Sequence, residues 1–125
     1  MCYTIVKKER HVAMREINLE IGYPNVERAM FVLKNELVTE RHKGTKQVKI
    51  IHGYGSTGTG GGSIKAACHK ELKGYIRTGT IRAFCPGEKF GPFADEGRNL
   101  VARYPQLKGD RDWARGNDGV TIVVF

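Results

Sequence analysis

The residues with the clearest capacity for chemistry stand in one glycine-rich segment, from His52 to Gly62. Six of these eleven residues are glycine, and they lie between a β-branched run and a run with helical spacing. Glycine lets backbone N–H groups point into a concave turn, and the helix N-terminus that follows adds partial positive charge. The segment therefore predicts an anion-binding loop. Its expected contacts are His52, Gly53, Tyr54, Gly55, Gly58 and Ser63.

Two side chains in this segment allow more than one interpretation. His52 ends the strand before the loop, where an imidazole can donate a hydrogen bond to a phosphate or transfer a proton. It can equally be a buried histidine whose nitrogens are satisfied within the protein. Tyr54 can stack on a base or merely cover the loop. The sequence leaves both alternatives open.

The positive charge of the chain is concentrated around this segment. The net charge is +8, and residues 40–82 hold nine basic residues against two acidic ones, whereas the flanking parts are nearly balanced. A field of one sign attracts polyanions, of which nucleic-acid backbones are the commonest in a cytosol. A solvated surface kept charged for solubility is the alternative. The basic residues expected to contact a backbone are Lys49, Lys65, Lys70 and Arg77.

Two nucleotide-binding motifs fit the segment poorly. Gly53, Gly55 and Gly58 have the spacing of the dinucleotide fingerprint, but the following helix is expected to begin only at Ser63, and no suitably placed acidic residue follows. A Walker A loop needs Gly-Lys-Ser/Thr, and here Ile64 follows Ser63. The sequence thus predicts no nucleotide cofactor.

The elements around the segment predict an α/β fold of the α+β two-layer type. Alternation over residues 17–21 indicates a strand, and an apolar stripe from Val26 to Leu37 indicates a helix with Asn25 as N-cap and Gly44 after its end. The remaining elements are a strand at 47–51, a helix from Ser63 to about Tyr75, a strand at 78–84 and a last strand at 119–125. The order β-α-β-α-β-β predicts a four-stranded mixed sheet with two helices.

About thirty residues before the last strand carry no strong strand pattern. Residues 95–104 are expected to form a short helix capped by Asp95, and Phe90, Phe93 and Trp113 to pin this segment to the body of the domain. The chain is expected to be a single domain over 1–125, with a core at about 16–84 and 116–125 and an insert at about 86–115.

Three stretches together resemble the Smr (small MutS-related) domain family. The run V-K-I-I-H-G-Y-G resembles the family signature of an apolar strand leading into His-Gly-x-Gly, with His52, Gly53 and Gly55 at its positions. The ending G-N-D-G-V-T-I-V-V-F resembles the closing strand of the family, and L-E-I-G-Y-P-N-V-E-R-A its opening motif. The insert is not part of the resemblance.

The resemblance implies a fold like the C-terminal domain of translation initiation factor three, and binding to branched or structured DNA or RNA. Some members of the family also nick strands, and the resemblance implies that such cleavage would depend on the acidic residue and the histidine of the opening motif. Glu20 stands where aspartate is usual, and Gly22 where histidine is usual. A lost imidazole removes a general acid or base worth about 10²–10⁴-fold in rate, so the resemblance implies binding more strongly than cleavage.

Three functions follow from these observations. The first is a nucleic-acid-binding domain that holds the phosphate backbone. The second is a nicking endonuclease with Glu20 and His52 as catalytic residues and Mg²⁺ or Mn²⁺ as a metal, although no metal-ligand spacing is present. The third is a basic module that docks a protein or the ribosome. The absence of a signal peptide or apolar span predicts a cytoplasmic protein with no membrane association.

Overall fold

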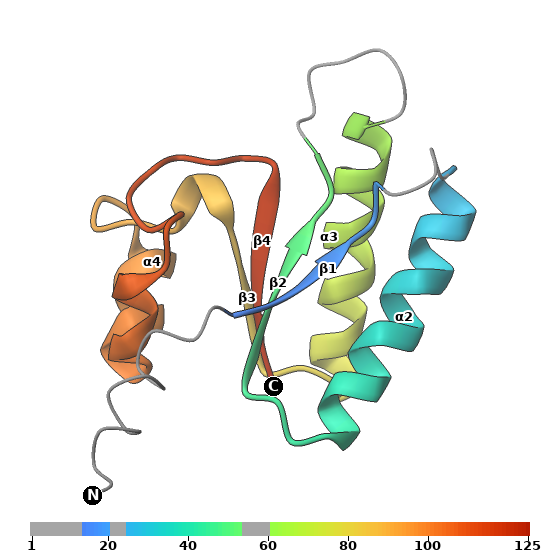
Figure 1. The fold of residues 1–125 in the computed structure, drawn as a ribbon, viewed down its shortest axis with the longest axis horizontal. Coiled ribbons are helices and arrows are strands. Elements are labelled where there is room, and N and C mark those ends of the chain that lie inside the picture. Colours follow the sequence, from blue (N-terminus) through green and yellow to red (C-terminus); the bar gives the residue numbers. More distant parts are fainter. Residues whose placement is uncertain (1–13, 21–24, 54–60) are drawn as a thin grey trace, which may run out of the picture.

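The computed structural model describes residues 14–20, 25–53 and 61–125, with side chains from residue 64 onward in the last range. A four-stranded sheet in the order β1-β2-β4-β3 forms its centre (Figure 1). β1 and β2 are parallel, and β4 is antiparallel to both of its neighbours, which confirms the predicted mixed sheet. The strands are β1 (Arg15–Asn18), β2 (Gln47–Ile51), β3 (Ala83–Pro86) and β4 (Val120–Val124), and the helices are α2 (Val26–His42), α3 (Gly61–Arg77) and α4 (Asp95–Arg103).

Helix α2 begins and ends where the sequence predicts. The side chain of Asn25 accepts a hydrogen bond from the Arg28 amide, and Gly44 follows the last turn with φ of +83°. A positive φ is costly for residues with a Cβ, so glycine suits this position. The helix buries Ala29, Leu33 and Leu37 against the sheet. These three residues belong to the apolar stripe from Val26 to Leu37 that the sequence predicts.

Helix α3 begins earlier than predicted. It starts at Gly61, which places Ser63 at the third helical position rather than at the N-cap. The glycines at 61 and 62 can adopt helical angles like any other residue, so the glycine-rich composition did not mark the helix start. The helix then packs Ile64, Cys68 and Leu72 into the core beside α2.

Strand β3 is shorter than the predicted strand at 78–84. The chain leaves α3 through a tight turn, in which the Thr80 amide donates to the Tyr75 carbonyl and Gly79 has φ of +78°. An extended backbone is incompatible with that turn. Pairing with β4 therefore starts only at Ala83, opposite Val124.

The segment before β4 covers the second face of the sheet. In Figure 1, α4 lies on one side of the sheet, and α2 and α3 lie on the other. Two short 3-10 helices, η1 (Gly87–Lys89) and η2 (Pro105–Gly109), flank α4. Phe90, which follows η1, and side chains of α4, η2, β3 and β4 form a second core on this face: Cys85, Phe90, Leu100, Val101, Leu107, Ile122 and Val124.

The aromatic residues of this segment behave differently from one another. Phe90 is buried and meets Trp113 edge to face, with 5.1 Å between ring centroids, as expected of residues that pin the segment. Phe93 is 96% exposed, so the prediction that it also pins the segment is wrong. Its turn is fixed instead by the backbone, because Gly97 packs directly against Gly91. The N-cap of α4 is Ala94 and not the predicted Asp95, which is the first residue of the helix.

Candidate nucleic-acid interface

The parallel strands β1 and β2 end side by side at one edge of the sheet. The Leu19 amide donates to the Ile51 carbonyl at 2.8 Å, so the chain after each strand leaves from the same place. The carboxylate of Glu20 lies against the Cα of Gly53, where a Cβ would collide with it. Gly53 has φ of +85°. The structure therefore places Glu20 beside Gly53 and its neighbour His52, which come more than thirty residues later in the sequence.

His52 is fully buried, and both of its ring nitrogens have partners inside the protein. Nδ1 lies 2.9 Å from the Gly53 carbonyl oxygen, and Nε2 lies 2.8 Å from Oγ1 of Thr121. Burial lowers the pKa of His52, and the hydrogen bond to Gly53 opposes this shift. A phosphate contact or proton transfer would need a nitrogen that here bonds within the fold. Of the two interpretations that the sequence leaves open, the geometry agrees with a buried histidine whose nitrogens are satisfied within the protein.

Beside His52 lie a second histidine and an ion pair. Nε2 of His69, on α3, is 2.9 Å from Oγ1 of Thr121, and the two imidazole rings meet edge to face. Burial, together with the nearby His52 and Lys65, lowers the pKa of His69 to about 4. Lys65 is largely buried and its ammonium pairs with Glu88 at 3.3 Å. Lys65 would have to leave this carboxylate to bind a phosphate.

The outer face of α3 carries three exposed cations in a row, Lys70, Lys73 and Arg77. Steps of three and four residues place them on one side of the helix, about 4.5 and 6 Å apart along its axis. In the described part of the chain none of the three has an ion-pair partner. We call these residues the α3 stripe. It includes Lys73, which the sequence analysis did not select.

Lys49 does not belong to any binding surface. It lies in β2 but faces α4 and the residues that follow it, and it is 1% exposed. Its ammonium lies 2.7 Å from Asp110 and 2.6 Å from Asp112. A phosphate cannot reach a cation held in this way, so the predicted backbone contact of Lys49 is incompatible with the structure.

The remaining predicted residues either lie outside the described part of the chain or lie far from Gly53. Tyr54, Gly55 and Gly58 lie outside the described residues, and so does the side chain of Ser63. Arg77 lies at the C-terminal end of α3, and Lys46 and Arg82 also lie at the end of the sheet remote from Gly53. The basic residues therefore do not all surround the exit of β2.

His69, Thr121 and Glu88 also lie around His52, and none of them was predicted from the sequence. Thr121 is the one polar residue within an apolar strand, V-T-I-V-V, which is a signal that a buried partner exists. No comparable signal marks His69, because its partners are more than fifty residues away in sequence.

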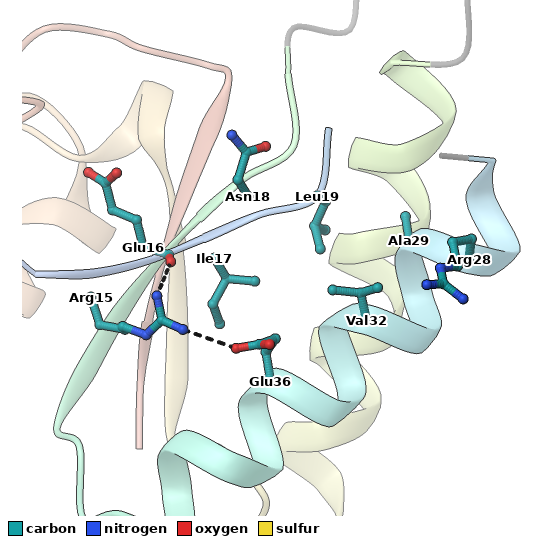
Figure 2. A pocket seen from close by; sticks show the side chains of 9 residues that line it. All are labelled: Arg15, Glu16, Ile17, Asn18, Leu19, Arg28, Ala29, Val32 and Glu36. Atoms are coloured by element: carbon teal, nitrogen blue, oxygen red, sulfur yellow. Dashed lines mark hydrogen bonds and ion pairs between the residues drawn. The ribbon is translucent and has the colours of Figure 1, made fainter. Parts of the chain in front are cut away.

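A cavity of about 410 Å³ lies between β1 and α2, and none of the predicted site residues lines it (Figure 2). Its floor is apolar, and its rim includes Arg15 of β1 and Glu36 of α2, which form an ion pair at 3.2 Å. The Arg15 guanidinium also donates to the carbonyl oxygen of Glu16 at 2.8 Å. Among the described residues, β1 forms one edge of the sheet.

Within residues 14–20, 25–53 and 61–125, no three His, Cys, Asp or Glu side chains gather in a way that could hold a metal ion. Over the same residues, no helix combines the length and the apolar character needed to cross a bilayer.

The fold is similar to one of known structure. The Smr domain of MutS2 from Thermus thermophilus superposes with a TM-score of 0.54 and 20% sequence identity, over 89% of this chain and 96% of that one. No known family's sequence profile matches the chain. No curated protein matches it in sequence. The chain therefore has the fold of an Smr domain, in agreement with the sequence motifs.

Proposed function

We propose that the protein binds nucleic acid through its phosphate backbone, with the α3 stripe as the described part of the interface. The similarity to the fold of an Smr domain supports nucleic-acid binding in general, but not a particular set of contact residues. The observation that carries it is the stripe itself: Lys70, Lys73 and Arg77 are exposed, share one helix face and have no acidic partner among the described residues. The proposal also includes the glycine-rich segment that precedes α3 in the sequence, of which residues 54–60 lie outside the described residues.

The geometry of the stripe suits a regular polyanion. Its three cations span about 10 Å along the axis of α3, and phosphates of one strand in a duplex are spaced about 3.4 Å apart along the helix axis. Contacts of this kind fix position and orientation without reading bases, so we expect little sequence preference.

The test is a salt titration of binding to single-stranded DNA, duplex DNA, branched DNA and an RNA hairpin. The dependence of log K on log salt reports the number of phosphates neutralised, at about 0.9 per contact for duplex DNA. The triple variant K70Q/K73Q/R77Q should reduce the slope by about three and weaken binding to every probe that the wild type binds.

A matched control separates local contacts from net charge. The variant R103Q/K108Q/R115Q also removes three positive charges, from exposed residues of the segment that covers the opposite face of the sheet. Its slope should stay within about one of the wild-type value. Equal losses in both triple variants, or binding that is indifferent to salt, would contradict the proposed interface.

Strand nicking is a second candidate, favoured by the position of Glu20. Its carboxylate is exposed at the exit of β1, directly beside Gly53. The assay is nicking of supercoiled and branched DNA and of structured RNA, with and without Mg²⁺ or Mn²⁺. Activity that disappears in E20Q while binding is kept would support this candidate, and activity unchanged in E20Q would exclude a role for Glu20.

A further inference from the structure

A line of hydrogen bonds runs from α3 through β4 to the exit of β2. Nε2 of His69 lies 2.9 Å from Oγ1 of Thr121, and that oxygen lies 2.8 Å from Nε2 of His52. Nδ1 of His52 then lies 2.9 Å from the carbonyl oxygen of Gly53. Three side chains from three separate elements thus end on one backbone group. The proposed binding of nucleic acid makes no direct use of His69 or Thr121.

The carbonyl acceptor at one end and a neutral His52 ring together fix the direction of every bond in this line. A carbonyl oxygen only accepts, so Nδ1 of His52 must carry its proton. In a neutral imidazole Nε2 is then an acceptor, and the Thr121 hydroxyl donates to it. The oxygen of Thr121 in turn accepts from Nε2–H of His69. Burial lowers the pKa of both histidines, which agrees with two neutral rings.

The end of this line is the backbone at the proposed binding site. Gly53 has a positive φ, and its amide shares the Gly119 carbonyl with the amide of His52, at 3.1 and 3.0 Å. The amide of Gly53 is thus held by Gly119, directly before β4, and its carbonyl by the ring of His52. With both ends fixed, the residue keeps its Cα against the carboxylate of Glu20.

Charged groups surround the two histidines without bonding to them in the described part of the chain. Lys65 and Lys73 of α3, Glu88 after β3 and Glu20 after β1 all act on one or both rings through space. Lys65 and Glu88 pair with each other. The two rings therefore depend on Thr121, and not on a carboxylate, for their orientation.

We propose that His69 and Thr121 are positioning residues, which hold His52 as its Nδ1–H tautomer and thereby fix the Gly53 peptide beside Glu20. This inference rests on the proposed function only in that Gly53 begins the glycine-rich loop. His52 then has a structural role instead of a direct chemical one, and its ring is held by Thr121 of β4 and, through Thr121, by His69 of α3.

The first test reads the tautomer of His52 by ¹⁵N NMR on the labelled full-length chain at pH 7. The expected spectrum has a protonated Nδ1 and an unprotonated Nε2 for His52, and the reverse for His69. A protonated Nε2 on a neutral His52, or a charged His52 ring, would overturn the proposal, because the line of bonds could not then run in the stated direction.

The second test measures hydrogen exchange of the Gly53 amide, relative to that of Leu37 in the core of α2. T121V keeps the shape of the side chain and removes the hydroxyl, so exchange at Gly53 should become about ten-fold faster relative to Leu37. H69L should give about a three-fold increase. H69Q should restore the wild-type ratio, because the glutamine amide can donate to Thr121 as Nε2–H of histidine does.

The controls are T39V and H42L, which make the same changes at exposed positions of α2 and should leave the ratio unchanged. Equal acceleration at Gly53 and Leu37 would mean that the variants only destabilise the whole fold, and would overturn the positioning role. If exchange at Gly53 relative to Leu37 is as fast in H69Q as in H69L, the positioning role of His69 is overturned. Both tests use the free protein, so they stand or fall independently of nucleic-acid binding.

Discussion

Gly53 lies where a side chain is excluded for two separate reasons. Its φ of +85° is costly for any residue with a Cβ, and the space that a Cβ would fill holds the carboxylate of Glu20. The two reasons differ in how easily they are relieved. A glutamate carboxylate is the end of a flexible side chain and can rotate away, whereas the backbone angle is fixed by hydrogen bonds to Gly119.

The G53A variant tests which reason matters more. We expect a loss of about 1–2 kcal/mol in the free energy of unfolding, the usual cost of a Cβ at positive φ. The double variant G53A/E20A should recover less than about 0.5 kcal/mol, because it removes only the contact. Denaturant unfolding measures both values. Full recovery in the double variant would show that crowding, and not the backbone angle, sets the cost.

The two buried histidines make stability depend on pH. The folded-state pKa of His69 is lowered to about 4 by burial, while the unfolded chain titrates near 6.5, and the pKa of His52 is lowered as well. Stability is therefore complete above pH 6.5 and falls as the pH drops toward 4. One proton contributes at most about 1.4 kcal/mol per pH unit, and less here because His69 is partly exposed to solvent.

Unfolding of the wild type and of H69Q at pH 7.5, 6 and 5 measures this effect. The glutamine variant keeps a hydrogen-bond donor but cannot be protonated in this range. Its free energy of unfolding should decline less between pH 7.5 and 5 than that of the wild type. Parallel curves for the two proteins would assign the decline to other groups.

At the scale of elements, successive side chains of β2 point to opposite faces of the sheet and so contact two different layers of the molecule. Val48 and Ile50 face α2 and α3, whereas Lys49 faces the segment that covers the other side of the sheet. Asp112 receives its ammonium and also accepts from the side-chain amide of Asn117 at 2.9 Å. The loop before β4 is thereby tied to the central strand by a buried ion pair. Burial raises the pKa of the Asp112 carboxyl, but Asn117 and Lys49 outweigh it and lower the pKa overall.

Replacing Lys49 should be costly because its partners are enclosed. In K49M, the carboxylates of Asp110 and Asp112 lose their cation while the chain still folds around them, which typically costs about 3–5 kcal/mol. K43M is the matched control, since the ammonium of Lys43 is exposed and lies 3.6 Å from Glu40. That change should cost under about 1 kcal/mol. Denaturant unfolding at pH 7 compares them, and similar losses would contradict this interpretation of Lys49.

At the scale of the whole molecule, the sequence predicted local elements well and distant contacts poorly. The apolar stripe and caps of α2 and the β-branched run of β2 are local signals, and both elements appear as predicted. The meeting of Glu20 and Gly53 follows from parallel strands that end together. Lys49 was misjudged because a lysine in a strand is usually solvated, and nothing nearby reveals that Asp110 and Asp112 return to it sixty residues later.

The distribution of charge shows the same limit. The sequence placed nearly all the positive excess around one loop, and the fold spreads it along α3 and to the remote end of the sheet. Helical spacing could have identified the α3 stripe, because Lys70, Lys73 and Arg77 differ by three and four positions. The distance of Lys46 and Arg82 from the loop depends on strand order, which no local pattern encodes.

The hydrogen bond from Arg15 to the Glu16 carbonyl has a consequence for how copies of this protein behave in concentrated solution. The backbone of Leu19 faces β2, so by alternation the backbone groups of Glu16 face away from the sheet. A strand from another molecule would pair with this edge by donating a hydrogen bond to the Glu16 carbonyl. The guanidinium of Arg15 already donates to that oxygen. R15A should therefore leave the edge open to intermolecular pairing, and aggregate faster than R103A in a light-scattering assay at equal concentration. Equal rates would mean that the guanidinium gives this border no protection against self-assembly.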